Sequence, residues 1–562
     1  MRLQLYFLQL KICVSCMFDL QNILLRSDCR KLCQPHLRLL YHIPLAFRRR
    51  VCHTVSSMVA KVTCIAPIGF SGALIEVESD AKQGLPTLQI VGMGNKAIDE
   101  ARERVRSAIT NSLLEFPTKK ITVNLAPAEL PKDGSHYDVA IALSILCVSG
   151  QLQQSQLTSA AFVGELTLDG SIRPVRGIIN MAEIARDNNV STLYLPSQNL
   201  SQAQLVEGIE LIPVASLKEL FLVLKGEKRI SAPASVPAQP LKVTTGAVTL
   251  DDISGQEQAK RALTIAVAGR HNILLSGPPG SGKTLLAKTM LELLPPLSNS
   301  EKIAVTKLHS LAGETTEDII HQRPFRSPHH TASRTALIGG GTRPRPGEIS
   351  LAHHGVLFLD EIPEYPRSVL EALRQPLEDN TISITRAQGH VSYPADFMLI
   401  ATMNPCPCGF HGDSSRECTC SNNHIIQYQR KLSGPLLDRI DLVINVARVP
   451  SSEFLQVTKS LNEKQHAYAK NSVQSALIAQ QNRYGASNKY NSSLGSKRIA
   501  DIALLSPAAE RILNLASEKL QLSARSYFKT IKVARTIADI EGSATIEPTH
   551  LSEALQYRQQ VS

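Results

Sequence analysis

Residues 277–284 read Gly-Pro-Pro-Gly-Ser-Gly-Lys-Thr, a pattern that binds nucleotide phosphates. Its glycines let backbone N–H groups close around the phosphates, and the helix that follows presents its positive end to them. Lys283 can reach the β- and γ-phosphates, and the hydroxyl of Thr284 can bind Mg²⁺. The expected ATP-binding residues are Gly277, Pro278, Pro279, Gly280, Ser281, Gly282, Lys283 and Thr284.

Two acidic residues follow an apolar segment further along the chain. Residues 355–359 read Gly-Val-Leu-Phe-Leu, and Asp360 and Glu361 come directly after them. A buried parallel strand delivers its last side chains to the carboxyl edge of the sheet, where ligands bind in α/β proteins. We expect Asp360 to complete the Mg²⁺ site with Thr284, and Glu361 to polarise the water that attacks the γ-phosphate.

The elements that must position these groups are also visible in the sequence. Residues 272–276 form a short apolar run typical of a buried strand, and residues 285–291 have helical composition, so the phosphate-binding pattern has the strand–loop–helix setting that it needs. Another apolar run, residues 397–402, ends just before Asn404, whose amide can hold the γ-phosphate or the water without adding charge. These segments predict an α/β fold with a parallel sheet.

Composition excludes several other classes of protein. The 562 residues are enough for three or four domains, and aromatic residues make up only 4%, which argues against base stacking as the main mode of binding. No apolar run reaches the ~18 residues of a membrane-spanning helix. The eleven cysteines are clustered and do not resemble a disulfide framework, so we expect a cytoplasmic protein without a membrane partner.

The N-terminal segment, residues 1–57, differs from the rest. It holds nine lysines and arginines but only two acidic residues, so most of the net charge of +11 lies there, and the overall charge does not demonstrate nucleic-acid binding. Two closely spaced cysteine pairs could serve a zinc site, and a basic targeting arm is another alternative. We favour an extension, disordered or from a misassigned start, before a domain that begins near Met58.

Residues 58–228 have the pattern of an α/β domain. Strands are expected at residues 73–78, 121–125, 162–166 and 192–195, and helices at residues 97–112, 137–148 and 178–186.

Two segments of this domain resemble the proteolytic domain of Lon-type proteases, which has a ribosomal S5 domain 2-like α/β fold. They are NLAPAELPKDGSHYDVAIALSI, within residues 121–145, and GELTLDGSIRPVRG, residues 164–177. That family uses a Ser–Lys dyad, but here the nucleophile position aligns with His136 and the lysine position falls near Ile179, which cannot activate a nucleophile. Ser135 is the alternative nucleophile. We therefore expect a Lon-like fold without peptidase chemistry.

A linker rich in proline, alanine and serine, residues 229–248, precedes the nucleotide-binding domain at residues 249–450, and a helical lid follows at residues 451–562. These elements look like an AAA+ P-loop ATPase with Asn404 in the sensor 1 position. The chain resembles the bacterial magnesium-chelatase-like AAA+ family more closely, and this resemblance covers residues 58–562. The strings that carry it are RPFRSPHHTASRTALIGGG (323–341), RPGEISLAHHGVLFLDEIPEY (345–365), ATMNPCPCG (401–409), SGPLLDRIDL (433–442) and ARSYFKTIKVARTIADIEG (524–542).

The resemblance implies an ATP-hydrolysing ring, a homo-hexamer, with ATP at the subunit interfaces. For the members involved in competence, it implies a motor that migrates branched DNA during transformation and recombination. Arg439 then looks like the arginine finger offered to the neighbouring subunit, and a helix-end ion pair with Asp438 or Asp441 is the alternative. Arg525 matches the sensor 2 position on the lid, with Arg535 as the second candidate.

Two insertions of this AAA+ branch carry basic residues: the stretch 323–345 and a hairpin expected at residues 378–396. In the resembling family these elements face the central pore, where basic side chains contact DNA phosphates rather than bases. The candidate DNA-binding residues are Arg386, His390, Arg326 and Arg334. The alternative role for these residues is in interface ion pairs.

Four cysteines bracket a loop directly after Asn404, and four thiolates can form a structural zinc site, although the C-x-C spacing is tighter than usual. The alternative is a loop of reduced, neutral thiols. The four residues are Cys406, Cys408, Cys418 and Cys420.

The leading hypothesis is an ATP-driven DNA motor with Mg²⁺ as cofactor and single-stranded or branched DNA as partner. Two alternatives come from other classes. One is a chelatase-type remodeller of a protein partner, and the other is an ATP-dependent Lon-like peptidase, which His136 and Ile179 disfavour.

Overall fold

The computed structural model describes residues 59–558 with gaps at 93–94, 131, 133, 231–247, 316–317, 342–344, 387–388, 414–415, 450–464, 486–488, 496–497 and 500–501. The expectations for residues 1–57, and for most of the linker at 229–248, lie outside this part of the chain. Within it, no helix is long and apolar enough to cross a membrane.

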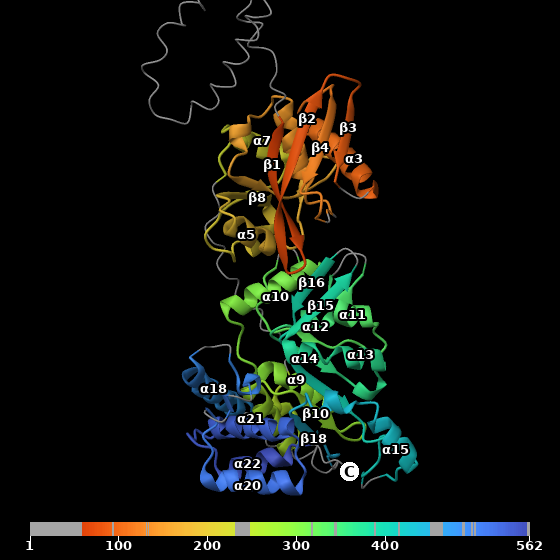
Figure 1. The fold of residues 1–562 in the computed structure, drawn as a ribbon, viewed down its shortest axis with the longest axis vertical. Coiled ribbons are helices and arrows are strands. Elements are labelled where there is room, and N and C mark those ends of the chain that lie inside the picture. Colours follow the sequence, from red (N-terminus) through yellow and green to blue (C-terminus); the bar gives the residue numbers. More distant parts are fainter. Residues whose placement is uncertain are drawn as a thin grey trace, which may run out of the picture. The chain divides into compact units, whose positions relative to one another are not determined.

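The first part of the chain folds around a seven-stranded sheet with the order β3-β4-β2-β1-β5-β8-β9 (Figure 1). Its strands are β1 (Ala60–Ile68), β2 (Ser71–Lys82), β3 (Thr87–Val91), β4 (Lys120–Ala126), β5 (Ala160–Phe162), β8 (Thr192–Pro196) and β9 (Glu210–Val214). β2 runs antiparallel to β1 and β4, and the other neighbouring pairs are parallel. Its helices are α3 (Asn95–Asn111), α4 (Asp138–Val148), α5 (Ile178–Asp187), α6 (Leu200–Ala203) and α7 (Leu217–Leu224).

The expected helices of this part, and the strands at residues 73–78, 121–125 and 192–195, are confirmed. The single strand expected at residues 162–166 is wrong, because the chain leaves the sheet after Phe162. The N–H of Gly164 donates to the carbonyl of His136 rather than to the ladder. The next residues form β6 (Glu165–Leu166), which pairs with β7 (Ile172–Arg173) in a separate hairpin.

The second sheet has five parallel strands in the order β11-β14-β17-β10-β18. The strands are β10 (Ile273–Ser276), β11 (Phe325–Arg326), β14 (Val356–Leu359), β17 (Met398–Met403) and β18 (Leu442–Asn445). β14 and β17 are buried along their whole length, which explains why they read as continuous apolar runs. Since β10, β14 and β17 are adjacent and parallel, the residues that follow them meet at one edge.

Helices surround this sheet and form the C-terminal lid (Figure 1). The longer ones are α8 (Glu257–Gly269), α9 (Lys283–Leu293), α10 (Asn299–Ala312), α18 (Gln465–Tyr484), α20 (Pro507–Lys519), α21 (Ala524–Ile540) and α22 (Pro548–Gln556). The shorter elements include α11 (Arg334–Ile338), β12 (Gly339–Gly340), β13 (Arg345–Pro346), α12 (Glu348–Leu351), α13 (Arg367–Ala372), α14 (Pro376–Asp379), α15 (Asn422–Gln429) and α16 (Gly434–Leu437). The expected hairpin is present as β15 (Thr381–Arg386) and β16 (Gly389–Pro394).

Candidate functional site

The phosphate-binding pattern forms the turn between β10 and the N-terminus of α9. Gly277 is required by close packing, since a Cβ atom there would lie 2.2 Å from the carbonyl oxygen of Val446. Within the described residues, nothing hydrogen-bonds to the buried hydroxyl of Ser281, so this group is available to a ligand. An open pocket covers this turn, and it is lined by Gly280, Ser281, Gly282, Lys283, Thr284, Leu285 and Lys288.

Lys283 is buried and its ammonium group is held from two strands. Nζ donates to the carbonyls of Gly277 (2.7 Å) and Pro278 (2.9 Å), and to Oδ1 of Asn404 after β17 (3.3 Å). Burial lowers the pKa of Lys283, and the nearby carboxylates of Asp360 and Glu361 oppose that shift. The amide predicted to sense the γ-phosphate therefore touches the lysine predicted to bind it.

Asp360 follows β14 and faces the helix that carries Thr284. Thr284 Oγ1 donates to Asp360 Oδ2 at 3.3 Å, and Thr402 donates to the other carboxylate oxygen. The Thr402 hydroxyl also accepts the N–H of Glu361 at 2.9 Å, and Glu361 has a backbone φ of 50°. Thr402 thus fixes both acidic residues, and its only signal in the sequence is a polar residue inside the apolar run of β17.

The oxygen donors at this edge suit a magnesium ion. A hydroxyl and a carboxylate are the hard ligands that Mg²⁺ takes together with nucleotide phosphates and water. Thr284 and Asp360 lie within hydrogen-bonding distance of each other, so one small ion could be bound by both side chains. Thr284 and Asp360 themselves offer only oxygen atoms, which fits Mg²⁺ rather than a softer metal.

Arg439 lies two residues after α16 and, in the part of the chain that the structure describes, has no hydrogen bond or ion pair with the phosphate-binding turn. Its guanidinium donates to the carbonyl of Pro435 at 2.7 Å and pairs with Glu378, in the last turn of α14 before the hairpin. The arginine side chain is 11% exposed and the glutamate side chain 53%. The carboxylate partner is thus Glu378 and not Asp438 or Asp441, the two partners considered from the sequence.

Two further contacts fix the segment that carries Arg439. Asn272, at the start of β10, donates to the carbonyl of Arg439 at 2.9 Å and accepts the N–H of Leu399 at 2.8 Å. Lys529 of the lid donates to the carbonyl of Ile440 at 2.6 Å. Sequence patterns gave no sign of these contacts.

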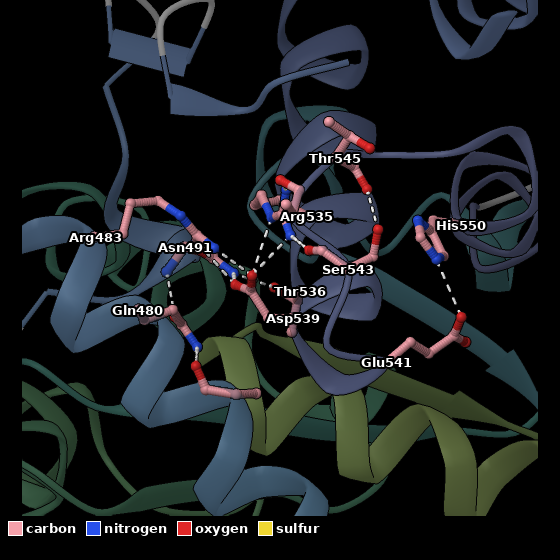
Figure 2. A network of polar contacts seen from close by, with 12 residues as sticks. Gln480, Arg483, Asn491, Arg535, Thr536, Asp539, Glu541, Ser543, Thr545 and His550 are labelled. Carbon is pink, nitrogen blue, oxygen red and sulfur yellow. Dashed lines mark hydrogen bonds and ion pairs between the residues drawn. The ribbon is translucent and has the colours of Figure 1, made fainter. Parts of the chain in front are cut away.

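The two lid arginines have opposite environments. Arg525, in the first turn of α21, is exposed and has no ion pair or hydrogen bond within the described part of the chain. Arg535 is buried, and Figure 2 shows its guanidinium pointing at Asp539 and at the turn after α21. It donates to Asp539 Oδ1 at 3.0 Å and to the carbonyl of Ala544 at 2.7 Å. This geometry favours Arg525 for contact with a nucleotide, whereas Arg535 stabilises the fold of the lid.

The candidate DNA-binding residues fall into three groups. Arg326 pairs with Glu348 (2.6 Å) and Glu314 (3.0 Å), which favours the ion-pair alternative for this residue. Arg334, the first residue of α11, and His390 of β16 are exposed. The side chain of Arg386 lies outside the described residues, although its backbone pairs with Gly389 at the end of the hairpin.

The four clustered cysteines come together in space. Their Sγ atoms all lie within 4.8 Å of one another, and none forms a disulfide. Cys406 is buried and the other three are half-buried.

The Lon-like part does not assemble a Ser–Lys dyad within the described residues. His136 occupies the predicted nucleophile position, and burial lowers its pKa to about 4, so the ring is neutral near pH 7. Ser135 donates to Glu165, and Ile179 is fully buried in the apolar core. The two predicted dyad positions therefore hold a neutral histidine and a core isoleucine.

Comparison with known proteins gives the same family for nearly the whole chain. Three family models match: "Magnesium chelatase, subunit ChlI" at residues 249–454, "Subunit ChlI of Mg-chelatase" at 77–199, and "Magnesium chelatase, subunit ChlI C-terminal" at 463–558. "Competence protein ComM" of Haemophilus influenzae is 43% identical over 499 residues, covering 88% of this chain and 96% of that protein. "Uncharacterized protein YifB" of Escherichia coli is 41% identical over 496 residues, with the same coverage.

A shorter similarity links the chain to Lon proteases. "Lon protease 2" of Bacillus subtilis is 28% identical over 193 residues, which is 30% of this chain and 35% of that protein. The similarity supports the Lon-like fold of the part that precedes the AAA+ sheet. The predicted fold class is thereby confirmed, and the family implies ATP hydrolysis with ATP and Mg²⁺. The chain belongs to the magnesium chelatase ChlI family of AAA+ ATPases.

Proposed function

We propose that this protein is an ATP-hydrolysing hexameric ring motor that acts on single-stranded or branched DNA, as a branch-migration helicase in transformation or recombination. The observation that carries the proposal is the meeting of Lys283, Asp360, Glu361 and Asn404 at one edge of the sheet. Such an edge binds a nucleoside triphosphate and hydrolyses it.

Each side chain has a defined task in hydrolysis. Lys283 and the N-terminus of α9 bind the phosphates, and Thr284 and Asp360 would hold the magnesium ion, which neutralises developing charge on the phosphate oxygens. Glu361 orients and polarises the attacking water, and Asn404 donates to the γ-phosphate or to that water. Arg525 is proposed to contact the nucleotide from the lid.

Arg439 supports a ring rather than a monomer. Within its own chain it contacts Glu378 and Pro435, and not the phosphate-binding residues. Its partner Glu378 is half exposed, so a neighbouring subunit that reaches this pair could draw the guanidinium away from the glutamate and toward its own nucleotide.

The choice of DNA rests on the name of the Haemophilus relative and on two exposed basic side chains. That relative is called a competence protein, and competence is the uptake of DNA by a bacterium. Arg334 and His390 are exposed on the inserted elements, and Arg386 is proposed to join them. Contacts of this kind bind phosphates, so affinity should fall steeply as salt rises.

The name of the matched family favours a second candidate, a chelatase-type remodeller of a protein partner. Both candidates hydrolyse ATP, so the test must vary DNA. The ATPase rate of the full chain is measured without DNA, with single-stranded DNA and with a four-way junction, at two salt concentrations. Lys283→Ala is the background control. An ATPase rate that rises with DNA, and rises less at high salt, supports the DNA motor. An ATPase rate that DNA does not change would refute the DNA motor and favour the remodeller.

A further inference from the structure

The loop after β17 gathers four sulfur atoms in a geometry that fits one metal ion. The distances are 3.3 Å from Cys406 to Cys408, 3.6 Å from Cys406 to Cys418, and 3.5 Å from Cys408 to Cys418. The sulfur atom of Cys420 lies within 4.8 Å of the other three. A tetrahedral zinc site with Zn–S bonds of about 2.3 Å places its sulfur atoms ~3.8 Å apart.

Other occupants fit these distances less well. A disulfide needs sulfur atoms about 2.05 Å apart, and the four cysteines are free. An iron–sulfur cluster with several irons spreads its cysteine ligands over different metal atoms, so their sulfur atoms stand further apart than here. Four soft thiolates in a tetrahedral arrangement select zinc over Mg²⁺ or Ca²⁺.

We propose that Cys406, Cys408, Cys418 and Cys420 bind one Zn²⁺ ion, and that this centre holds Asn404 and the phosphate-binding turn in position.

Among its described residues, the cysteine loop has few side-chain contacts apart from the cluster itself. Arg416 stacks over the ring of Phe410 with 4.4 Å between Cζ and the ring centroid. The backbone N–H groups of Phe410 and Thr419 donate to the sulfur of Cys408 and fix its position in the loop. The described part of the loop thus buries one cysteine and stacks one ring, and a metal ion can supply further stability.

Two contacts connect this loop to the ATP site. Gly409 packs so closely on the phosphate-binding turn that a Cβ atom would lie 2.6 Å from Cδ of Pro279, and its φ of +86° also disfavours any other residue. Cys406 is two residues from Asn404, and the intervening Pro405 accepts a hydrogen bond from Gln429 of α15 at 3.2 Å. A metal ion at Cys406 therefore limits how far Asn404 can move from Lys283.

The first part of the test is the metal content of the purified full-length protein. We expect about one zinc ion per chain, with little iron. Cys408→Ser combined with Cys418→Ser should remove the zinc, whereas Cys147→Ser, a half-buried free cysteine outside the cluster, should keep it. Cobalt replacing zinc should give the visible absorption of tetrahedral Co²⁺–thiolate. Iron in place of zinc, no metal, or zinc retained in the double variant would overturn the site.

The second part measures whether the metal supports nucleotide binding, and it rests on the proposed ATP site. Binding of a fluorescent ATP analogue is compared for zinc-loaded, chelated and zinc-restored wild-type protein, which needs no substitution. We expect a roughly tenfold loss of affinity on chelation, the scale of one misplaced polar contact, and recovery with zinc. Unchanged affinity after verified zinc removal would overturn the link. Zinc present without any ATP binding would instead refute the proposed function.

Discussion

The ion pair between Arg439 and Glu378 gives the sharpest test of the proposed ring. If Arg439 completes a neighbour's active site, Arg439→Ala should leave ATP binding by its own chain intact and reduce hydrolysis. Arginine fingers contribute ~10³–10⁵ in rate, or about 4–7 kcal/mol of transition-state stabilisation. Steady-state ATPase rates and equilibrium binding of an ATP analogue measure the two quantities separately.

Glu378→Gln gives the opposite prediction from the same pair. The glutamate side chain is half exposed, so the ion pair contributes about 0–1 kcal/mol. Removing the charge of Glu378 should therefore raise the population of unpaired Arg439 by at most about fivefold. We therefore expect Glu378→Gln to hydrolyse ATP at the wild-type rate or up to about five times faster. A loss of activity comparable to that of Arg439→Ala would show that the pair itself is the functional unit.

Mixing two inactive variants separates a ring from a monomer. Arg439→Ala keeps a sound phosphate-binding turn, and Lys283→Ala keeps a sound finger. In a mixed ring some interfaces combine intact Lys283 with intact Arg439, so partial activity should return. If Arg439→Ala lowered the ATPase rate tenfold or less, and mixing restored no activity, Arg439 would have only a structural role.

Three further predictions concern the ATP site, the N-terminal segment and a buried histidine. Lys283→Ala should lose tight ATP binding and Glu361→Gln should keep it while turnover stops, because only the lysine meets charge in the ground state; equal affinity in Lys283→Ala and wild type would contradict this. Removing residues 1–57 should change neither the ATPase rate nor assembly measured by light scattering, and a lost oligomer would refute it. Burial, with His354 and Arg270, lowers the pKa of His353 to about 3 against the opposing Asp396. Below pH 6.5 the histidine takes up a proton in the unfolded state but not in the folded state. The free energy of unfolding should therefore be highest above pH 6.5 and fall by about 2 kcal/mol between pH 7 and pH 5. In urea unfolding, His353→Asn should not show this fall.

The clustering of Lys283, Asp360 and Asn404 was predictable because its signals are local. The turn around Lys283 needs a strand before it and a helix after it, and both are visible as apolar and helical runs. Asp360 and Asn404 follow buried strands, whose continuous apolar residues are recognisable without knowing their neighbours. Parallel order then brings the strand ends together, so three separate segments predict one site.

The partners of charged residues were not predictable in the same way. Glu378 lies far from Arg439 in the sequence, and Arg326 draws on Glu314 and Glu348 from different elements. Tertiary packing decides which charged residues pair. A basic stretch of sequence does not show whether its side chains face solvent or carboxylates. The contact of Gly409 with Pro279 is of this kind too, since close packing leaves no pattern except a glycine.

The lid offers a last prediction, which separates a nucleotide contact from a structural charge. Asp539 is 3% exposed and accepts hydrogen bonds from Arg535, Arg483 and Asn491 (Figure 2). Asn491 also donates to the hydroxyl of Thr536 at 3.0 Å. That hydroxyl forms a hydrogen bond of 2.8 Å with Nε2 of His271, between α8 and β10. The network thereby joins the lid to the helix–strand turn before the phosphate-binding segment.

Arg535→Ala removes one guanidinium from this buried network, so it should lower the free energy of unfolding by about 3–5 kcal/mol, the range for a broken buried ion pair. Arg525→Ala removes an exposed side chain without a described partner, so stability should change by less than ~0.5 kcal/mol while ATP turnover falls. Urea unfolding and ATPase assays on both variants, with the exposed Arg511→Ala as a matched control on α20, measure the two effects. If Arg525→Ala were destabilising and Arg535→Ala only slowed turnover, the two roles would have to be exchanged.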